Sequence, residues 1–254
     1  MLLAVDVGNT QTHVGAFSGS DLIGDWRLAT RGDSTADELA LALAGSLQFR
    51  DLEWNAIEGL ILSTVVPRLE PEYERLCERH LDAHFVLVGP AARTGMPIRI
   101  DNPRELGSDR LVNAVSAYEK VGGRCLSVDF GTSINFDAVS ADGEYLGGVI
   151  APGLEVSIEA LSSRAAKLPR FQLTEPDVAI GRSTQAALQS GFAYGFAGLV
   201  DGVVTRLRDE LGADATVIAT GGMAATIAPL CENIDEVDPY LTLCGLRLIW
   251  ERNR

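Results

Sequence analysis

The stretch Leu2-Leu3-Ala4-Val5-Asp6-Val7-Gly8-Asn9-Thr10 is matched midway along the chain by Cys125-Leu126-Ser127-Val128-Asp129-Phe130-Gly131-Thr132-Ser133. In both copies an apolar run leads to an acid, then to Gly and to a hydroxyl side chain. Asp6 and Gly24 are as far apart in the sequence as Asp129 and Gly147, so the copies align without a gap. A unit repeated at this distance predicts two similar half-molecules rather than a solenoid of short repeats.

Both copies continue with the pattern of three consecutive antiparallel strands. In the first copy, alternation and turn residues predict strands at 2–6, 11–17 and 22–28, with a turn at 18–21. In the second, the same reasoning predicts strands at 125–129, 134–140 and 144–150, with a turn at 141–143. Each Asp-Gly-hydroxyl segment therefore lies at the tip of a buried strand, and two facing tips would form a cleft for phosphate and metal.

Helical periodicity and strand-like runs fill the remainder of the chain. Ser34 or Thr35 is expected to cap a helix that carries Leu39, Leu41 and Leu43. Pro67 is expected to begin another helix. The full set is strands at 58–64, 84–88 and 215–220, with helices at 67–80, 109–120, 153–167, 184–210, 223–231 and 241–250. The sum is an α/β chain with halves at 1–119 and 120–254.

Composition excludes several functional classes. The chain has 254 residues, 46% of them hydrophobic, and a formal charge of -14, which argues against nucleic acid or an anionic membrane as the main partner. No apolar run reaches the ~18 residues of a membrane span. The N-terminus also lacks the basic segment and following apolar core that are typical of a cleaved signal peptide. We therefore expect a cytoplasmic protein.

Lysine usage narrows the choice of nucleotide-binding chemistry. The only lysines are Lys120 and Lys167, and neither lies in a Gly-rich loop, so the Walker phosphate-binding pattern is absent. Any bound nucleotide would depend on backbone N–H groups, hydroxyls and metal ions. The four cysteines form no C-x-x-C pair, which favours reduced core thiols over zinc ligation, and the three histidines form no recognisable triad.

The first Asp-Gly-hydroxyl segment has the features of a phosphate site. Gly8 permits a sharp turn, and successive N–H groups at such a turn can surround an anion. Asn9, Thr10 and Thr12 offer further donors, and Asp6 could hold Mg²⁺ through water. The alternative is an ordinary hairpin whose Asp caps the turn. The second copy favours the functional interpretation, because a simple turn needs no matched partner.

Four other segments are candidate sites with a structural alternative. Asp109 could act as a base and Arg110 could bind a substrate carboxylate with its planar fork, or Asp109 could be a plain helix N-cap. Gly221-Gly222 could admit a ligand at a helix N-terminus or simply pack tightly. Ser183 or Thr184 could be a cap, and Gly147 to Gly153 could shape the floor of a cleft.

Taken together, these motifs resemble one family along essentially the whole chain, the type III pantothenate kinases. The resemblance rests on the following segments: Asp6-Val7-Gly8-Asn9-Thr10, Asp101-Asn102-Pro103, Gly107-Ser108-Asp109-Arg110, Asp129-Phe130-Gly131-Thr132, Gly147-Gly148-Val149-Ile150-Ala151-Pro152-Gly153, Gly181 with Thr184, Ser190-Gly191, Leu241-Thr242-Leu243 and Gly245-Leu246-Arg247.

The resemblance implies a fold and an activity. The fold is the actin-like one of acetate and sugar kinases, with two ribonuclease-H-like halves and a cleft between them. The activity is ATP-dependent phosphorylation of pantothenate to 4'-phosphopantothenate, the first step of coenzyme A biosynthesis. Members of the family are cytosolic homodimers that need a divalent metal, Mg²⁺, and a monovalent cation, K⁺ or NH₄⁺.

The resemblance also implies roles for individual residues. Asp109 would be the catalytic base, Asp6 would lie near Mg²⁺, and Asp129 would hold the monovalent cation. The residues implied to bind ATP phosphates are Asp6, Val7, Gly8, Asn9, Thr10, Gln11, Thr12, His13 and Thr132. Those implied to bind pantothenate are Gly107, Ser108, Asp109, Arg110 and Thr184.

Two segments depart from the family pattern and define the alternatives. Ile100 stands where many relatives have a Tyr that touches pantothenate, and Ser133-Ile134-Asn135 stands where relatives usually read Ala-Thr-Thr. The first alternative is a catalytically decayed accessory or regulatory relative that binds a ligand or partner without turnover. The second is an ATP-switched interaction protein, which would hydrolyse ATP without pantothenate.

Overall fold

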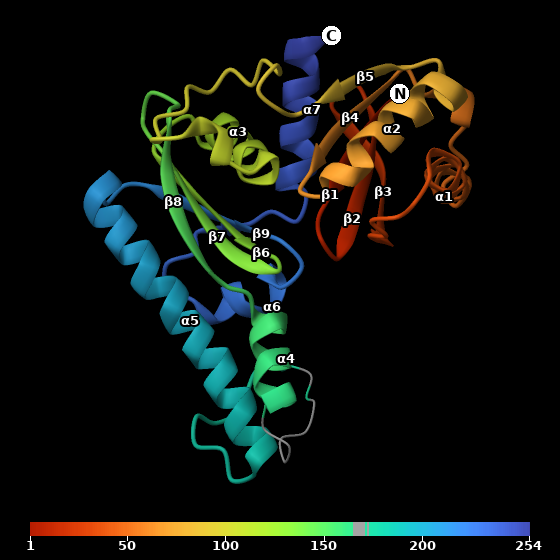
Figure 1. Cartoon of the computed structure of the whole chain (residues 1–254). Helices are drawn as coiled ribbons and strands as arrows, with labels where there is room; N and C mark the ends of the chain where they lie inside the picture. Colours follow the sequence, from red (N-terminus) through yellow and green to blue (C-terminus); the bar gives the residue numbers. More distant parts are fainter. Residues whose placement is uncertain (165–170, 172) are drawn as a thin grey trace. The chain divides into compact units, whose positions relative to one another are not determined.

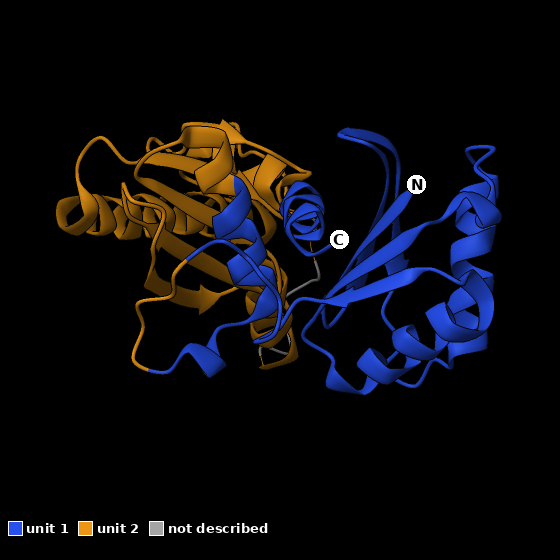
Figure 2. Ribbon diagram, turned by 90° about the horizontal axis from the view of Figure 1, so that it is seen from above, with its two compact units in different colours: residues 1–96, 102–116, 242–254 blue, residues 97–101, 117–241 orange. Residues whose placement is uncertain are grey.

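The computed structural model describes residues 1–164, 171 and 173–254. The described chain divides into two compact units, drawn in different colours in Figure 2. Unit 1 comprises Met1–Met96, Asn102–Ser116 and Thr242–Arg254, and unit 2 comprises Pro97–Asp101 and Ala117–Leu241. The C-terminal segment thus belongs to the same unit as the N-terminus. The last residues of the helix expected at 153–167 lie outside the described residues, and the expected halves at 1–119 and 120–254 stay a prediction.

Unit 1 contains a five-stranded mixed sheet with the order β3-β2-β1-β4-β5 (Figure 1). Its strands are β1 (Leu2–Val7), β2 (Gln11–Ser18), β3 (Asp21–Ala29), β4 (Gly59–Thr64) and β5 (His84–Leu87). β2 is antiparallel to β1 and β3, whereas β4 is parallel to β1 and β5 is parallel to β4. All five strands match the sequence-based expectations to within one or two residues.

Unit 2 repeats this topology, with the order β10-β9-β6-β7-β8. Its strands are β6 (Cys125–Phe130), β7 (Ser133–Val139), β8 (Tyr145–Pro152), β9 (Thr216–Thr220) and β10 (Glu236–Val237). The antiparallel pairs β6–β7 and β7–β8 and the parallel pairs β6–β9 and β9–β10 correspond one by one to those of unit 1. The repeat in the sequence is therefore a repeat of the fold. Only β10 was not expected, because two exposed residues carry no periodic signal.

Helices connect and flank the strands. The α-helices are α1 (Ala36–Gln48), α2 (Glu70–Leu76), α3 (Ser108–Val121), α4 (Leu154–Arg164), α5 (Thr184–Leu211), α6 (Ala224–Ile227) and α7 (Leu241–Asn253). Short 3-10 turns lie at η1 (Trp54–Ala56), η2 (Pro67–Leu69), η4 (Pro103–Glu105) and η5 (Ala228–Leu230), and a π-helical turn, η3 (Cys77–Leu81), ends α2. Within the described residues, no helix is both long enough and apolar enough to cross a membrane.

The two copies do not align residue for residue, although their sequence spacing is equal. In unit 1 four residues, 8–11, separate the paired Val7 and Thr12, whereas three residues, 131–133, separate Phe130 and Ile134. The next turn compensates, because Ser18 pairs with Asp21 while the backbone N–H of Ser140 reaches the Glu144 carbonyl. The two copies thus match in sequence without a gap because unit 2 has a shorter first turn and a longer second turn than unit 1.

Each sheet has one face buried against helices of its own unit. In unit 1 the alternate residues Leu3, Val5 and Val7 of β1 join apolar residues of α1 and α2 in one core cluster. In unit 2 Leu126, Val128 and Phe130 of β6 join residues of α4, α5 and α6. The period-2 alternation of each strand thus leaves Asp6 and Asp129 on the opposite face of their sheets.

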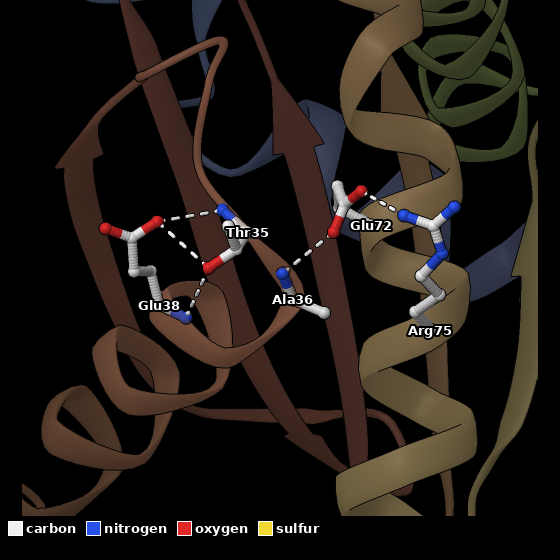
Figure 3. A network of polar contacts seen from close by, with 5 residues as sticks. All are labelled: Thr35, Ala36, Glu38, Glu72 and Arg75. Carbon is white, nitrogen blue, oxygen red and sulfur yellow. Dashed lines mark hydrogen bonds and ion pairs between the residues drawn. The ribbon is translucent and has the colours of Figure 1, made fainter.

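A polar network joins the starts of α1 and α2 (Figure 3). Thr35 caps α1 by accepting the backbone N–H of Glu38 at 3.3 Å, and the Glu38 carboxylate accepts the backbone N–H of Thr35 at 2.9 Å. The Glu72 carboxylate accepts the backbone N–H of Ala36 at 2.9 Å and pairs with Arg75. The cap expected at Ser34 or Thr35 is therefore Thr35. The start of α1 is also hydrogen-bonded to α2 through Glu72.

Replacing the cap residue, Thr35→Val, should lower the free energy of unfolding by about 1 kcal/mol, because a first-turn N–H loses its acceptor. Urea denaturation monitored by circular dichroism measures this loss. Ser20→Ala in the exposed turn between β2 and β3 is the control and should change stability by less than ~0.5 kcal/mol. Equal effects of the two substitutions would contradict the capping role.

Candidate phosphate-binding and acid–base site

The first Asp-Gly-hydroxyl segment forms the tight connection between β1 and β2. The backbone N–H of Gly8 donates to the Gln11 carbonyl at 3.0 Å, which closes the turn. Asn9, Thr10 and Gln11 are exposed at its tip. Thr12 is buried, and its hydroxyl lies 2.9 Å from that of Thr30, the residue just after β3. The turn thus presents polar side chains to solvent above the buried pair Val7 and Thr12.

His13, on β2, differs from the residues of the turn because its ring contacts a side chain of the neighbouring strand β3. It is buried, and its Nε2 lies 3.2 Å from the Asp25 carboxylate of β3. Burial and the positive charge of Arg27 lower the pKa of His13, while the Asp25 carboxylate partly opposes the shift. A neutral, buried imidazole supplies no positive charge for a phosphate.

The second segment, between β6 and β7, is shaped by a glycine that the sequence places far from it. Gly131 and Thr132 are exposed at the turn. The backbone N–H of Gly153, just after β8, donates to the Thr132 carbonyl at 3.1 Å. A Cβ at Gly153 would lie 2.2 Å from that carbonyl oxygen, so no other residue fits without moving the turn. Gly153 therefore supports the Gly131-Thr132 turn, and the expected role of the Gly147–Gly153 segment in shaping the floor of a cleft stays a prediction.

Asp129 is held by the strands and turn around it. Its register partners are Asn135 of β7 and Thr220 of β9, both nearly fully buried. Gly221 adopts φ +94, and a Cβ there would lie 2.4 Å from Asp129 Oδ1. Gly221 is therefore packed tightly against the Asp129 carboxylate, whereas a Cβ at Gly222 would meet no atom within 4 Å, and ligand entry at this pair stays a prediction.

The start of α3 is joined to the end of β4 by a cluster of hydroxyls. Ser108 Oγ lies 3.1 Å from Ser63 Oγ, and it accepts the backbone N–H of Thr64 at 3.2 Å. Ser63 is the register partner of Asp6, since β4 runs parallel to β1. Ser108 therefore brings the Gly107–Arg110 segment to the same sheet edge as the Asp6 turn, within unit 1.

Asp109 lies in the first turn of α3 rather than at its cap, because the helix already begins at Ser108. Its carboxylate folds back over Gly107, where a Cβ would lie 2.5 Å from Asp109 Oδ1. Burial raises the pKa of the Asp109 carboxyl, and the backbone N–H and positive charge of Arg110 partly oppose the shift. A partly buried carboxylate with a raised pKa is suited to accept a proton.

The remaining expected site residues belong to unit 2. Thr184 is the first residue of α5 and is exposed, while Ser183 is the N-cap that accepts the backbone N–H of Ala186 at 3.1 Å. Ile100 follows an edge segment in which Arg99 pairs with Glu144, and its Cγ2 would lie 3.6 Å from a Cβ at Gly147. The structure thus assigns the cap to Ser183 and leaves the Thr184 hydroxyl at the surface.

The Ser133-Ile134-Asn135 segment forms a local polar contact beside Asp129. The Ser133 hydroxyl donates to Asn135 Oδ1 at 2.9 Å, and Asn135 faces Asp129 across the β6–β7 pair. An amide therefore lies next to this carboxylate. Its orientation is set by a neighbour two positions earlier in the same strand.

Sequence reasoning missed Ser63 and Thr64 as parts of this site. Both end β4, and their backbone or side chains contact Ser108. A signal was available, because hydroxyl residues at the carboxyl end of a buried parallel strand lie at the edge where sites form in α/β sheets. The run Leu60-Ile61-Leu62-Ser63-Thr64 has that pattern.

The oxygen donors fit a metal that keeps other ligands of its own. Among the described residues, no group of three or more His, Cys, Asp or Glu could hold a metal ion. Mg²⁺ is usually held by one or two carboxylates together with waters and substrate phosphates, which the single Asp6 at a strand end suits. Asn135 and Thr220 are the register partners of Asp129 on the two neighbouring strands, so their side chains share its face of the sheet.

The cysteines match the expectation of core thiols in two of four cases, since Cys77 and Cys125 are buried while Cys231 and Cys244 are partly exposed. All four are free thiols, and burial raises the pKa of Cys77, Cys125 and Cys231 to about 12 in each case. Thiols with so high a pKa are protonated near neutral pH, and the buried Cys77 and Cys125 are small core residues.

Two similar mixed sheets with flanking helices, each with an acid and a Gly-containing turn at the end of its first strand, define a two-lobed α/β fold. A solved structure of the ROK hexokinase from Thermus thermophilus matches with a TM-score of 0.52 at 15% identity, covering 100% of this chain and 99% of that one. At this identity the likeness shows the fold alone.

Family comparisons identify the chain more closely. The family model of type III pantothenate kinases matches residues 2–206. The type III pantothenate kinase of Moorella thermoacetica is 48% identical over 253 residues, and that of Frankia alni is 50% identical over 254 residues, each with 100% of both chains covered. The chain therefore belongs to the type III pantothenate kinase family.

Substituting Gly221→Ala should lower the free energy of unfolding by about 1–3 kcal/mol, because the new Cβ meets a carboxylate in a backbone conformation that L-residues resist. Gly222→Ala is the matched control, since a Cβ there has no atom within 4 Å. Thermal or urea unfolding of both variants checks this. A Gly221→Ala protein as stable as the control would show that the turn can relax.

Removing the Asp109 charge, Asp109→Asn, should raise the free energy of unfolding at pH 7. Because the folded pKa is raised, ionisation favours the unfolded chain, and the penalty grows as pH rises above about 4, the unfolded value. The gain in the free energy of unfolding that Asp109→Asn produces should therefore vanish at acidic pH. Urea titrations between pH 4 and 8 measure it, with the exposed Asp51→Asn as control. A gain that is independent of pH would point to packing instead of charge.

Proposed function

We propose that this protein phosphorylates pantothenate with ATP, giving 4'-phosphopantothenate and ADP, the first step of coenzyme A biosynthesis. Membership of the type III pantothenate kinase family supports this activity. The single structural observation that carries it is the contact of Ser108 with Ser63 and Thr64. It brings a partly buried acid, Asp109, to the sheet edge that ends in the Asp6 turn.

The Asp6–His13 segment is the proposed phosphate-binding element for ATP. The exposed Asn9, Thr10 and Gln11 would offer side-chain donors, while Gly8 keeps the turn tight. Val7 and Thr12 support it from the buried pair at its base. His13 fits this role less well than the other residues, because its ring interacts with Asp25.

Asp6 is the proposed ligand for Mg²⁺, directly or through water. When bound, this ion would neutralise charge on the phosphates. The chain has no lysine in a Gly-rich loop, so a bound cation would supply this charge there, and phosphoryl transfer depends mainly on positioning and on charge neutralisation.

Asp109 is the proposed general base. It would accept the proton of the pantothenate primary hydroxyl as the oxygen bonds to the γ-phosphorus, and the bond from that phosphorus to the ADP oxygen breaks. Gly107 lets the carboxylate fold back over the helix start, and Ser108 anchors that start on β4. Arg110 would bind the pantothenate carboxylate, and Thr184 would add a further contact.

Unit 2 is proposed to supply one phosphate contact and the monovalent cation. The Thr132 hydroxyl, exposed at the second turn, would donate to a phosphate oxygen. Asp129 would hold K⁺ or NH₄⁺, with Asn135 and Thr220 as neighbouring oxygen donors. Gly221 supports this by leaving room for the Asp129 carboxylate.

The setting of the enzyme is proposed from the resemblance and the composition. We infer a cytoplasmic homodimer with pantothenate and ATP as its ligands, without a nucleic-acid or membrane partner. The charge of -14 supports the last point, since both surfaces are anionic. A catalytically decayed accessory relative is disfavoured, because Asp6, Asp109, Arg110 and Asp129 are all present.

The purified protein should release ADP from ATP in the presence of Mg²⁺ and K⁺ only when pantothenate is added. Asp109→Asn should lower kcat by about 10²–10⁴-fold, since a positioned base contributes that much. A coupled assay for ADP measures both values.

Asp51→Asn, which removes an exposed acid, is the matched control and should keep the rate of the wild type. ATP hydrolysis without pantothenate would favour the ATP-switched interaction protein. Absence of turnover despite ATP and pantothenate binding would favour the decayed relative, and absence of both turnover and binding would refute the kinase assignment. Replacing K⁺ by Na⁺ should slow the reaction if the cation proposal holds.

A further inference from the structure

The motif Leu241–Arg247 begins the C-terminal helix α7, and none of the proposed catalytic roles involves it. From Thr242 onward this helix belongs to unit 1, together with β1, β2, β4 and residues 108–116 of α3. A segment at the very end of the chain therefore packs with the elements that carry Asp6 and Asp109. Figure 2 shows this helix in the colour of unit 1, near the C-terminus.

α7 lies directly on the sheet of unit 1, with side chains placed where the strands have no Cβ. A Cβ at Gly15 of β2 would lie 2.9 Å from Leu243 Cδ1, and one at Gly59 of β4 would lie 2.0 Å from the Trp250 ring. Gly15 is the register partner of Ala4, and Gly59 that of Leu2. These contacts occur on the sheet face that also carries Asp6, because β1 side chains alternate.

The same helix is locked onto α3 by two contacts. A Cβ at Gly245 would lie 2.3 Å from the Val112 carbonyl oxygen, so the two helix backbones touch there. The Thr242 hydroxyl donates to Asn113 Oδ1 at 2.7 Å, and Asn113 is fully buried. Backbone contact and a partly buried hydrogen bond together define both the distance and the register of the helix pair.

The contacted residues of α3 lie on the same side of the helix as Asp109. Val112 and Asn113 follow Asp109 by three and four positions, and such residues are neighbours on one helical face. At its start, α3 is held by Ser108 on β4. The first turns of α3 are therefore fastened at two points, one on β4 and the other on α7, which itself rests on β2 and β4.

We propose that α7 is a positioning element for catalysis, in which Thr242 and Gly245 set the place of Asp109 relative to the Asp6 turn. The proposal rests on the proposed function, since it assigns these residues to the alignment of the base. A misplacement of ~1 Å can cost about 10²-fold in rate, so a modest shift of α3 would reduce turnover without unfolding the protein. It explains why the final helix carries a Thr and a Gly at these two positions.

The test compares Thr242→Val with Thr242→Ser and with Thr35→Val. Thr242→Val keeps the shape of the side chain but removes the donor to Asn113, and Thr242→Ser retains it. Thr35→Val removes a hydroxyl hydrogen bond at α1, on the opposite face of the sheet. We expect Thr242→Val to lower kcat about 10- to 100-fold, with the Kd for ATP unchanged. Thr242→Ser should restore kcat, and Thr35→Val should not alter it.

Amide hydrogen exchange provides a readout that does not depend on activity. Residues 108–116 should exchange faster in Thr242→Val than in the wild type or in Thr35→Val. A kcat for Thr242→Val equal to that of the wild type, or lowered no more than by Thr35→Val, would overturn the positioning role.

If the wild type itself shows no pantothenate-dependent turnover, the proposed function fails and the exchange data decide alone. Faster exchange confined to residues 108–116 of Thr242→Val would then still support α7 as the element that holds α3. Unchanged exchange in that segment would refute the inference.

Discussion

The contact between Ser108 at the start of α3 and the Ser63-Thr64 end of β4 is the constraint on which the candidate site depends. β4 lies parallel to β1, with Ser63 opposite Asp6. One hydroxyl therefore links the acid of a helix to the acid of a strand that comes about a hundred residues earlier in the sequence. Without this link, the burial that raises the pKa of Asp109 would have no defined relation to the phosphate-binding turn.

Glycines complete the site by allowing close approach of backbone rather than by adding flexibility. Gly107 makes room for the Asp109 carboxylate, and Gly221 makes room for that of Asp129. Gly153 rests on the carbonyls of the Gly131-Thr132 turn, and Gly245 rests on that of Val112. In each case an added Cβ would meet polar atoms at less than 3 Å. The candidate site residues can therefore take their positions only because these glycines have no side chain.

The two units show how a repeat can be preserved in topology while its details change. Strand order and pairing are the same in both sheets. The first turn of unit 2 is one residue shorter than that of unit 1, and the following turn is longer, so the equal sequence spacing conceals two opposite changes. The shorter β6–β7 turn of unit 2 carries Thr132, and the longer β1–β2 turn of unit 1 carries Asn9, Thr10 and Gln11. This difference fits the unequal phosphate-binding roles proposed for the two turns.

The sequence by itself determined the local elements of this protein. Alternation of apolar residues, a cap at Ser34 or Thr35 and the repeated Asp-Gly-hydroxyl segment predict the strands, a helix start and the class of chemistry, because each signal lies within a few residues. Only the tertiary structure decided that Ser63 meets Ser108, that Gly221 lies on Asp129, and that α7 joins unit 1. It also showed that His13 is bound to Asp25. These contacts join residues that are distant along the chain, and no local pattern encodes them, since they depend on which faces of the sheets and helices pack together.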